Sequence, residues 1–303
     1  MKHNKGQDVN GWLIVDKPKG MGSTDVVRKT KKIFQAKKNG HAGTLDPFAT
    51  GVLPVAFGEA TKLLPFITDG NKEYEFVVQW GATTDTDDED GNLVNECNKI
   101  PSLDEIKNIL PSFLGKIIQV PPVYSAIKIN GDRAYDLARK GVEVVMPPRE
   151  VEIFSLEILE DFPFQKQTKF KVRCSKGTYV RTLGRDIALK LGTLGFLKDL
   201  RRTKCGNFDL SHKILLENLE NIVYGEDLNK FLLPLETFLC DITVIAVSEV
   251  DAAKLKLGQG LSPKNYDVSQ YVGSCAVATC FNKLVAIVRI EESKIAPVRV
   301  FNL

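Results

Sequence analysis

Two segments far apart in the chain alternate apolar with polar residues, and this pattern constrains the fold more than any other feature. Residues 73–80 place Tyr, Phe, Val and Trp at every second position, and residues 168–174 place Phe, Val and Cys opposite Lys, Lys and Arg. A period of two is typical of a β-strand that buries one face. We therefore expect strands over both segments and a further strand over residues 151–159.

Other segments carry the period of an amphipathic helix. One helix is predicted to begin at Thr24 as its N-cap, and another at Ser102, which can form a capping box with Glu105. Because helices and strands do not alternate regularly, the sequence predicts an α+β fold rather than a series of βαβ units. Further helices are expected at residues 134–140, after Gly177 as far as Gly192, and at residues 249–257.

Breaks in these patterns indicate how the chain is divided. Residues 124–150 contain Gly131, Gly141 and Pro147 and are predicted to form an irregular insertion. The composition changes near Asp241, and the remaining segment reads as a compact β-rich module of about 60 residues, a size at which small domains can fold alone. We expect one domain over residues 1–240 and a second over residues 241–303.

Several functional classes find no support in the sequence. No apolar run approaches the roughly 18 residues that cross a bilayer, and the polar N-terminus shows no secretory signal, so a soluble cytoplasmic protein is expected. The six cysteines and three histidines show no metal-binding spacing. No dinucleotide-binding, P-loop or nucleophile-elbow motif occurs. The acidic segment at residues 81–91 departs from the calcium-binding loop pattern at Thr86. We expect no metal and no cofactor.

The distribution of charge is more informative than its total of +3. Residues 17–38 contain eight basic side chains and a single acid, and Lys198, Arg201, Arg202 and Lys204 form a second basic cluster. Two such clusters in a nearly neutral chain are consistent with one positive face that binds a polyphosphate. A lysine-rich helix face exposed to solvent explains the first cluster equally well.

The segment GHAGTLDPFATGVLP, residues 40–54, concentrates glycine, proline and small residues around one His and one Asp. This composition predicts a loop of fixed, unusual backbone geometry, which is a common setting for a functional side chain. Asp46 is therefore the candidate catalytic residue. The simpler alternative is a turn in which Asp46 only caps backbone N–H groups.

This segment closely resembles the active-site motif of the TruB family, the tRNA pseudouridine-55 synthases. Other blocks of that family follow in the same order: GWLIVDKPKGMGST, KEYEFVVQWGATTDTDD, QVPPVYSAIKINGDRAYDLARKG, CSKGTYVRTLGRDIA and LKDLRRTKCGNF. The resemblance is strong over residues 11–210 and weak beyond them. It implies a mixed, largely antiparallel sheet with flanking helices, a PUA-like C-terminal domain, and an isomerase that converts one uridine of tRNA to pseudouridine.

The same resemblance assigns roles to individual residues. It implies that Asp46 is the catalytic carboxylate, that Arg181 pairs with it, and that Tyr74 stacks on the target uracil and assists proton transfer. Tyr179 and Leu200 would line the uridine pocket, and His41 would meet the RNA beside the flipped nucleotide. From pattern alone, each has a plainer explanation, such as a core position for Tyr74 and Leu200 or a surface position for Arg181.

The predicted reaction needs no added group, and an aspartate free in water is already ionised at pH 7. The target base must be flipped out of the tRNA T-arm. We expect phosphate contacts from Lys17, Lys19, Lys31, Lys32, Arg201 and Arg202, with residues 124–150 as a clamp on the RNA and the protein acting as a monomer. A non-catalytic RNA-binding or RNA-folding protein is the main alternative, although it would not require Asp46, Tyr74 and Arg181 together.

Overall fold

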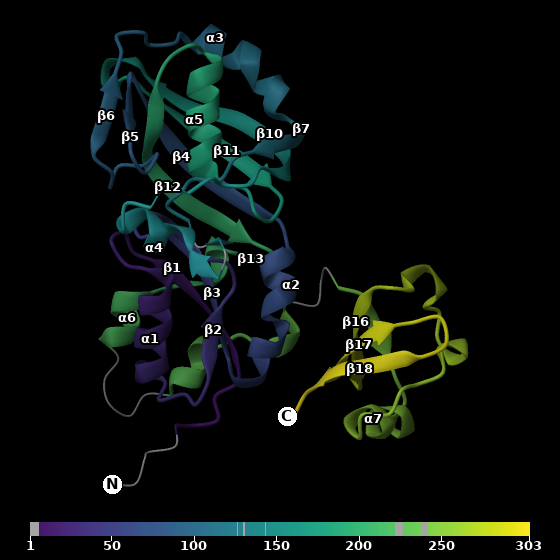
Figure 1. Ribbon diagram of the computed structural model, residues 1–303. Coiled ribbons are helices and arrows are strands. Elements are labelled where there is room, and N and C mark those ends of the chain that lie inside the picture. Colours follow the sequence, from purple (N-terminus) through teal and green to yellow (C-terminus); the bar gives the residue numbers. More distant parts are fainter. Residues whose placement is uncertain (1–5, 126, 130, 143, 222–226, 238–241) are drawn as a thin grey trace.

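The computed structural model describes residues 6–125, 127–129, 131–142, 144–221, 227–237 and 242–303. Within these residues a ten-stranded sheet runs through most of the chain in the order β14-β1-β3-β12-β4-β11-β10-β7, with β2 paired to β3 and β13 paired to β12 (Figure 1). Its strands are β1 (Gly11–Lys17), β2 (Asn39–His41), β3 (Thr50–Phe57), β4 (Lys72–Trp80), β7 (Gly115–Gln119), β10 (Arg149–Phe162), β11 (Gln167–Cys174), β12 (Gly195–Cys205), β13 (Phe208–Asp209) and β14 (Lys213–Leu215).

The sheet is mixed and largely antiparallel, which confirms the predicted fold class. The β1–β14 and β3–β12 pairs are parallel, whereas the other strand pairs described in this sheet are antiparallel. The two strands predicted from alternation, β4 and β11, are neighbours, so Tyr74 lies opposite Val172 on one side and opposite Arg202 of β12 on the other. The strand β12 therefore connects β4 with β3 and brings the two halves of the sheet together.

Helices flank this sheet: α1 (Ser23–Ile33), α2 (Leu64–Asp69), α3 (Leu103–Ile109), α5 (Val180–Lys190) and α6 (Leu216–Glu220). The capping box of Ser102 and Glu105 is confirmed. The predicted N-cap of α1 is wrong by two residues, because Gly22 occupies that position. The side chain of Ser23 is not free to cap the helix either, since it bonds to the backbone of Leu45.

The core explains why the alternating strands pair. The rings of Phe76 and Phe170 stack with centroids 5.2 Å apart across β4 and β11, and Trp80 donates its indole N–H to Thr168 Oγ1 at 2.9 Å. Helix α5 packs on β4 and β12, and the absence of a side chain at Gly184 permits close contact with Leu197. The start of α5, which carries Arg181, is thereby held at a fixed place over the sheet.

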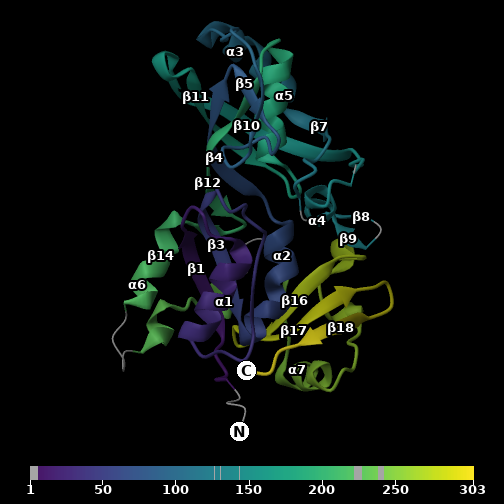
Figure 2. The same cartoon turned by 60° about the vertical axis from the view of Figure 1, so that its left-hand side comes forward.

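Two hairpins and a short helix leave the sheet. The hairpin of β5 (Ala82–Thr84) and β6 (Leu93–Glu96) follows β4 and carries the acidic segment. The predicted insertion contains β8 (Lys128–Ile129), β9 (Asp132–Arg133) and α4 (Ala134–Arg139). In Figure 2 this insertion projects beyond the edge of the large sheet.

The C-terminal module is a four-stranded sheet of β15 (Val244–Ala246), β16 (Cys275–Cys280), β17 (Lys283–Ile290) and β18 (Ile295–Val300), with α7 (Glu249–Lys256). It has an apolar core of its own, yet Leu284, Ile287 and Phe301 share a second core with Trp12 of β1. Figures 1 and 2 both place it beside the half of the molecule that contains α2. The predicted boundary between residues 240 and 241 lies in a segment outside the described residues. In the described part of the chain, no helix has the length and apolar character needed to cross a membrane.

Candidate active site

Asp46 lies in the loop that joins β2 to β3, and several contacts fix this loop. The Ser23 hydroxyl donates to Leu45 O and accepts from Leu45 N, at 2.9 and 2.8 Å. The next residue after Asp46, Pro47, offers its carbonyl oxygen to Gly20 N at 2.8 Å and to Lys17 Nζ at 3.1 Å. Helix α1, β1 and the loop are therefore joined around Asp46.

The loop leaves no room for a side chain where it enters β3. A Cβ atom at Gly51 would lie 2.2 Å from the carbonyl oxygen of Arg202, and the φ angle of Gly51 is +102°. Only glycine adopts this conformation at no steric cost. The glycine-rich composition thus reflects close contact between the loop and β12.

Asp46 pairs with Arg181 at the start of α5. The distance from Arg181 Nε to Asp46 Oδ2 is 2.9 Å, and the side chains are 4% and 34% exposed, respectively. The Nε–H is not aligned for a hydrogen bond within the described residues, so the contact is an ion pair in which the arginine is buried and the carboxylate remains accessible. The sequence prediction that these two residues meet is thus matched by the geometry.

The remaining donors of Arg181 orient its guanidinium. They bond to the carbonyl oxygens of Thr86 at 2.9 Å and Tyr124 at 2.8 Å, and Nη1 lies 3.3 Å from Asp88 Oδ2. Burial raises the pKa of Asp88, and the nearby Thr86 hydroxyl and Arg181 oppose this rise. Arg181 therefore holds together the acidic hairpin, the base of the insertion and the candidate catalytic loop.

An open pocket of about 240 Å³ lies beside the ion pair. Five residues predicted at the site line it together with Asp46: Tyr74, Tyr179, Arg181, Leu200 and Arg202. They come from β4, the N-terminus of α5 and β12, which are distant in sequence and meet only in the folded chain.

Burial raises the pKa of Tyr74 well above its ordinary value, and Arg202 opposes the rise. Burial also raises the pKa of Tyr179, with Arg149 as the main opposing group. Both phenols consequently stay protonated at neutral pH. They can stack or donate a hydrogen bond, but the phenolate form that would accept a proton is disfavoured.

His41 lies on β2, outside the lining of this pocket. Burial lowers its pKa, and Arg202 lowers it further. The imidazole is therefore neutral near pH 7. Its Nδ1 atom is buried without a hydrogen-bond partner in the described part of the chain.

Two of the side chains predicted to contact phosphates are buried. Lys17 is 0% exposed and Arg202 is 1% exposed. Lys17 Nζ donates to the carbonyl oxygens of Pro18, Met21 and Pro47, and burial lowers its pKa to about 8. Arg202 donates to Val52 O at 2.8 Å and to Gly43 O at 3.0 Å. Both residues therefore bond to the loop from inside the protein, and Arg202 also lines the pocket.

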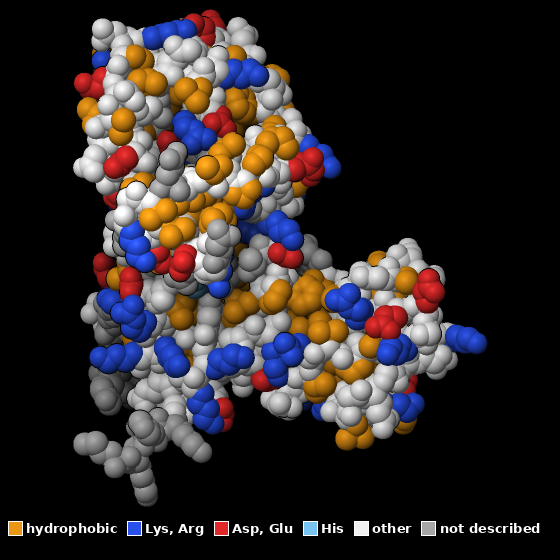
Figure 3. Space-filling model, in the orientation of Figure 1, with side chains coloured by type: hydrophobic (Ala, Val, Ile, Leu, Met, Phe, Trp, Pro, Cys, Tyr) orange, Lys and Arg blue, Asp and Glu red, His pale blue; other side chains and the backbone are white. Residues whose placement is uncertain are grey.

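The other predicted phosphate contacts differ among themselves. Lys31 and Lys32 are exposed on α1. Figure 3 shows a band of basic side chains across the lower half of the molecule and the C-terminal module. Lys19 is exposed but paired with Glu89 at 2.5 Å, and Glu89 also pairs with Lys198 at 2.8 Å. Arg201 is half-buried and pairs with Asp16 at 2.7 Å.

Sequence reasoning did not identify three further residues of the site. Asp88 attracts attention in the sequence only as part of a calcium-like acidic segment, although it contacts Arg181. Lys72 and Ser125 line the pocket, and each lies in a block that resembles the family. Asp88 is 4% exposed. The signal that could have identified it is its place in a block that resembles the family.

Comparison with known proteins gives a consistent result. The sequence matches the TruB family pseudouridylate synthase N-terminal domain over residues 31–180 and the tRNA pseudouridylate synthase B C-terminal domain over residues 181–240. A tRNA pseudouridine synthase B from Caulobacter vibrioides is 44% identical over 308 residues, which cover 100% of this chain and 99% of that protein. One from Nitrobacter winogradskyi is 47% identical over 302 residues, covering 98% of this chain and 84% of that protein.

Among solved structures, the chain resembles one described as the crystal structure of a Cbf5-Nop10-Gar1 complex. The TM-score is 0.76 with 26% identity, and the match covers 96% of this chain and 84% of that one. The fold, the buried arginine paired with a loop aspartate, and these relatives define an RNA-modifying isomerase of the pseudouridine synthase class. Within that class, the chain belongs to the TruB family.

Proposed function

We propose that this protein isomerises uridine 55 in the T-arm of tRNA to pseudouridine, with Asp46 as the catalytic carboxylate. The observation that carries the proposal is the accessible Asp46 carboxylate, held 2.9 Å from the buried Arg181 at the wall of an open pocket. A protein that only bound RNA would have no use for a carboxylate in this position. Relatives over nearly the full length of the chain are tRNA pseudouridine synthases.

The reaction breaks the bond between the ribose C1′ and uracil N1 and forms a bond between C1′ and C5. The proton leaves C5 and N1 gains one, so the atoms balance without a co-reactant. Asp46 can add to the nucleotide as a nucleophile, or remove and return a ribose proton. Arg181 serves both roles in the same way, because it fixes the carboxylate while leaving part of it exposed.

The uracil must leave the base stack to reach this pocket. Tyr74 offers an aromatic ring in the pocket lining, and stacking on such a ring recovers about 1–3 kcal/mol per base. Leu200 provides an apolar contact from the adjacent strand. We infer that these two residues hold the base while it rotates, and that His41 contacts RNA nearby.

The phosphates of the RNA would be bound mainly by the exposed side chains of Lys31 and Lys32 and by basic side chains such as those that form the band in Figure 3. Lys19 can join them if a phosphate replaces Glu89. The insertion at residues 124–150 would act as the clamp, and the C-terminal module would act as a PUA-like RNA-binding domain. We propose that the protein acts in the cytoplasm. We also propose that it acts as a monomer, since one chain supplies the pocket lining described above.

The direct test is to incubate the purified protein with an unmodified tRNA transcript, adding no cofactor. Pseudouridine should form at position 55. A transcript with cytidine at position 55 should give none, and pseudouridine elsewhere in that control would contradict the proposed specificity. Failure to form any pseudouridine with the first transcript would overturn the proposed function.

A further inference from the structure

Ser125 lies in the lining of the active-site pocket and has a hydroxyl group that the fold does not use. The residue is 5% exposed, it lines the pocket with Asp46 and Arg181, and its Oγ atom is buried with no hydrogen-bond partner in the described residues. Buried hydroxyls are nearly always bonded, and an unsatisfied one costs about 1–3 kcal/mol. An orphaned hydroxyl at a pocket wall therefore points to a bond made when the pocket is filled.

The backbone around Ser125 holds it firmly. Its N–H donates to Val123 O at 2.9 Å, and its carbonyl oxygen accepts from Tyr135 N at 3.1 Å, which connects it to α4. The carbonyl oxygen of the preceding residue, Tyr124, accepts from Arg181 Nη2 at 2.8 Å. Residues 124 and 125 thus join the arginine of the ion pair to the helix of the insertion.

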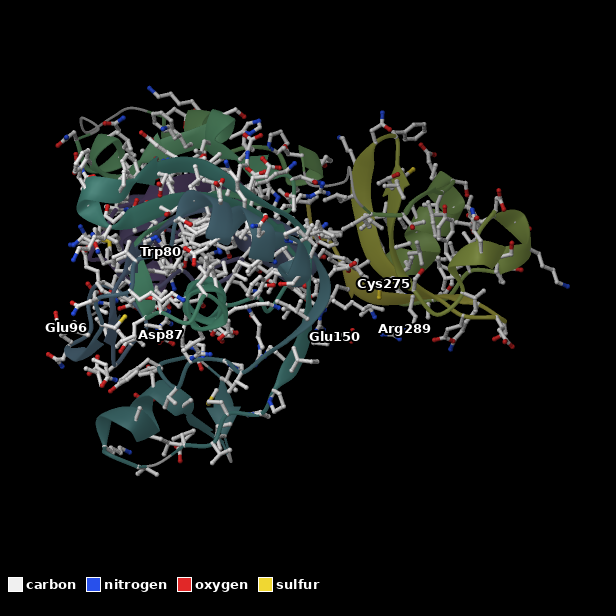
Figure 4. The ribbon with its side chains drawn as sticks, turned by 90° about the horizontal axis from the view of Figure 1, so that it is seen from above. Trp80, Asp87, Glu96, Glu150, Cys275 and Arg289 are labelled. Atoms are coloured by element: carbon white, nitrogen blue, oxygen red, sulfur yellow. The ribbon has the colours of Figure 1, made fainter. Side chains whose placement is uncertain are left out.

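The insertion itself stands apart from the sheet. Figure 4, seen from above, shows it extending away from the body of the molecule, with the labelled Glu150 where the chain returns to β10. Ser125 is at the opposite end of this segment, where it leaves the pocket. A contact between Ser125 and a bound nucleotide would therefore depend on where the insertion lies.

Among the described residues, Tyr179 is a second group that could bond the Ser125 hydroxyl. The Ser125 hydroxyl lies close enough to that of Tyr179 to act on it as a hydrogen-bonding neighbour and to lower its pKa against the dominant effect of burial, but the contact lacks the geometry of a formed hydrogen bond. Tyr179 also lines the pocket, so the space between these hydroxyls belongs to the site where a nucleotide would enter.

We propose that the Ser125 hydroxyl hydrogen-bonds the flipped nucleotide and is a positioning residue for the reaction at Asp46. The inference rests on the proposed function. A serine hydroxyl both donates and accepts, and uridine offers imide carbonyl oxygens, an imide N–H and ribose hydroxyls. This bond gives the buried Ser125 hydroxyl a partner. It also connects the position of the bound nucleotide to the position of α4, to which the Ser125 backbone is bonded.

The test compares Ser125→Ala with the parent protein on unmodified tRNA. A hydrogen bond of this kind corresponds to about a tenfold change in rate. We expect the single-turnover rate at saturating tRNA to fall about tenfold, while tRNA affinity changes less than about twofold, because phosphate contacts dominate affinity. The thermal midpoint should not fall, since the substitution breaks no bond within the fold. An inactive parent protein would refute the proposed function itself. The inference about Ser125 is tested only against an active parent, so the two failures are distinguishable.

A second comparison separates contact with the nucleotide from an effect through Tyr179. The Ser125→Ala change is made again in a Tyr179→Phe background, where no tyrosine hydroxyl is present. A similar further loss of rate supports the proposal. It is overturned by a parent-like rate in Ser125→Ala, by a loss of affinity with an unchanged saturating rate, or by the disappearance of the effect in the Tyr179→Phe background.

Discussion

At the residue scale, a substitution of Asp46 tests the chemical step separately from RNA binding. Asp46→Asn keeps the shape of the side chain but removes its charge. We expect no detectable pseudouridine and a tRNA affinity close to that of the parent, because the proposed phosphate contacts lie elsewhere. Filter binding and a pseudouridine assay on the same preparation measure the two quantities. Activity comparable to the parent would falsify the catalytic role of the carboxylate.

Arg181→Lys tests geometry at constant charge. Lysine lacks the planar fork that reaches Asp46, Thr86 O and Tyr124 O together. We expect a rate lower by on the order of 100-fold, the scale of loss that small misplacements of catalytic groups produce, with little change in affinity. The single-turnover rate is the relevant measurement. A rate equal to that of the parent would show that charge alone suffices.

Arg181→Met leaves Asp88 buried without its cationic neighbour. The pKa of Asp88 is already raised by burial, and loss of Arg181 raises it further. When the pKa of a carboxyl is higher in the folded than in the unfolded state, the folded protein loses stability as the pH rises from the unfolded-state pKa to the folded-state pKa. The destabilisation of Arg181→Met relative to the parent should therefore be larger at pH 7.5 than at pH 5. Urea unfolding at the two pH values measures it, and an equal difference at both would contradict this account.

The residues that sequence reasoning placed correctly and incorrectly differ in a physical way. Asp46 and Arg181 could be paired because each lies in a block that resembles the family. Lys17 and Arg202 were expected on the surface because they are basic and stand near other basic residues. Their burial depends on carbonyl oxygens of the loop at residues 43–52, which reach them only after β1, β3 and β12 have paired. Local composition contains no signal for such contacts.

At the scale of elements, periodicity predicted the strands β4 and β11 and the helix α5, whereas it could not give their order in the sheet. That β4 lies between β11 and β12 follows from side-chain packing such as the stacking of Phe76 on Phe170. The start of α1 was misplaced because the Ser23 side chain bonds to the loop that carries Asp46. Tertiary contacts took precedence over local capping preference at this position.

Helix α1 carries the prediction that belongs to this scale. Lys31 and Lys32 are exposed at its end, and each phosphate that a lysine neutralises contributes about 0.7–0.9 to the slope of log affinity against log salt. The double variant Lys31→Ala, Lys32→Ala should flatten this slope by about 0.7–0.9 for each phosphate contact that is lost. The rate of pseudouridine formation at saturating tRNA should stay unchanged. Lys107→Ala, at an exposed position on α3, serves as the control. An unchanged slope in the double variant would place the RNA elsewhere.

At the scale of the whole molecule, the C-terminal module packs against the part of the chain that contains Asp46. Phe301 is 2% exposed within the core that includes Trp12. Nearby, Lys62 Nζ donates to Val300 O and Asn302 N donates to Glu59 Oε2, both at 2.7 Å. Deleting the module would expose this shared core, so its role is better tested by loosening the contact.

Phe301→Ala removes the central ring of that contact without altering the pocket. Truncating a buried phenylalanine costs about 3–5 kcal/mol, so the free energy of unfolding should fall by this order. If the module contributes affinity and not chemistry, KM for tRNA should rise while kcat stays within about twofold of the parent. Phe281→Ala removes the same ring from a site that is 79% exposed and should leave stability unchanged. A fall in kcat with an unchanged KM in Phe301→Ala would mean that the module acts on the chemical step, because the ion pair of Asp46 and Arg181 is built entirely by the other domain.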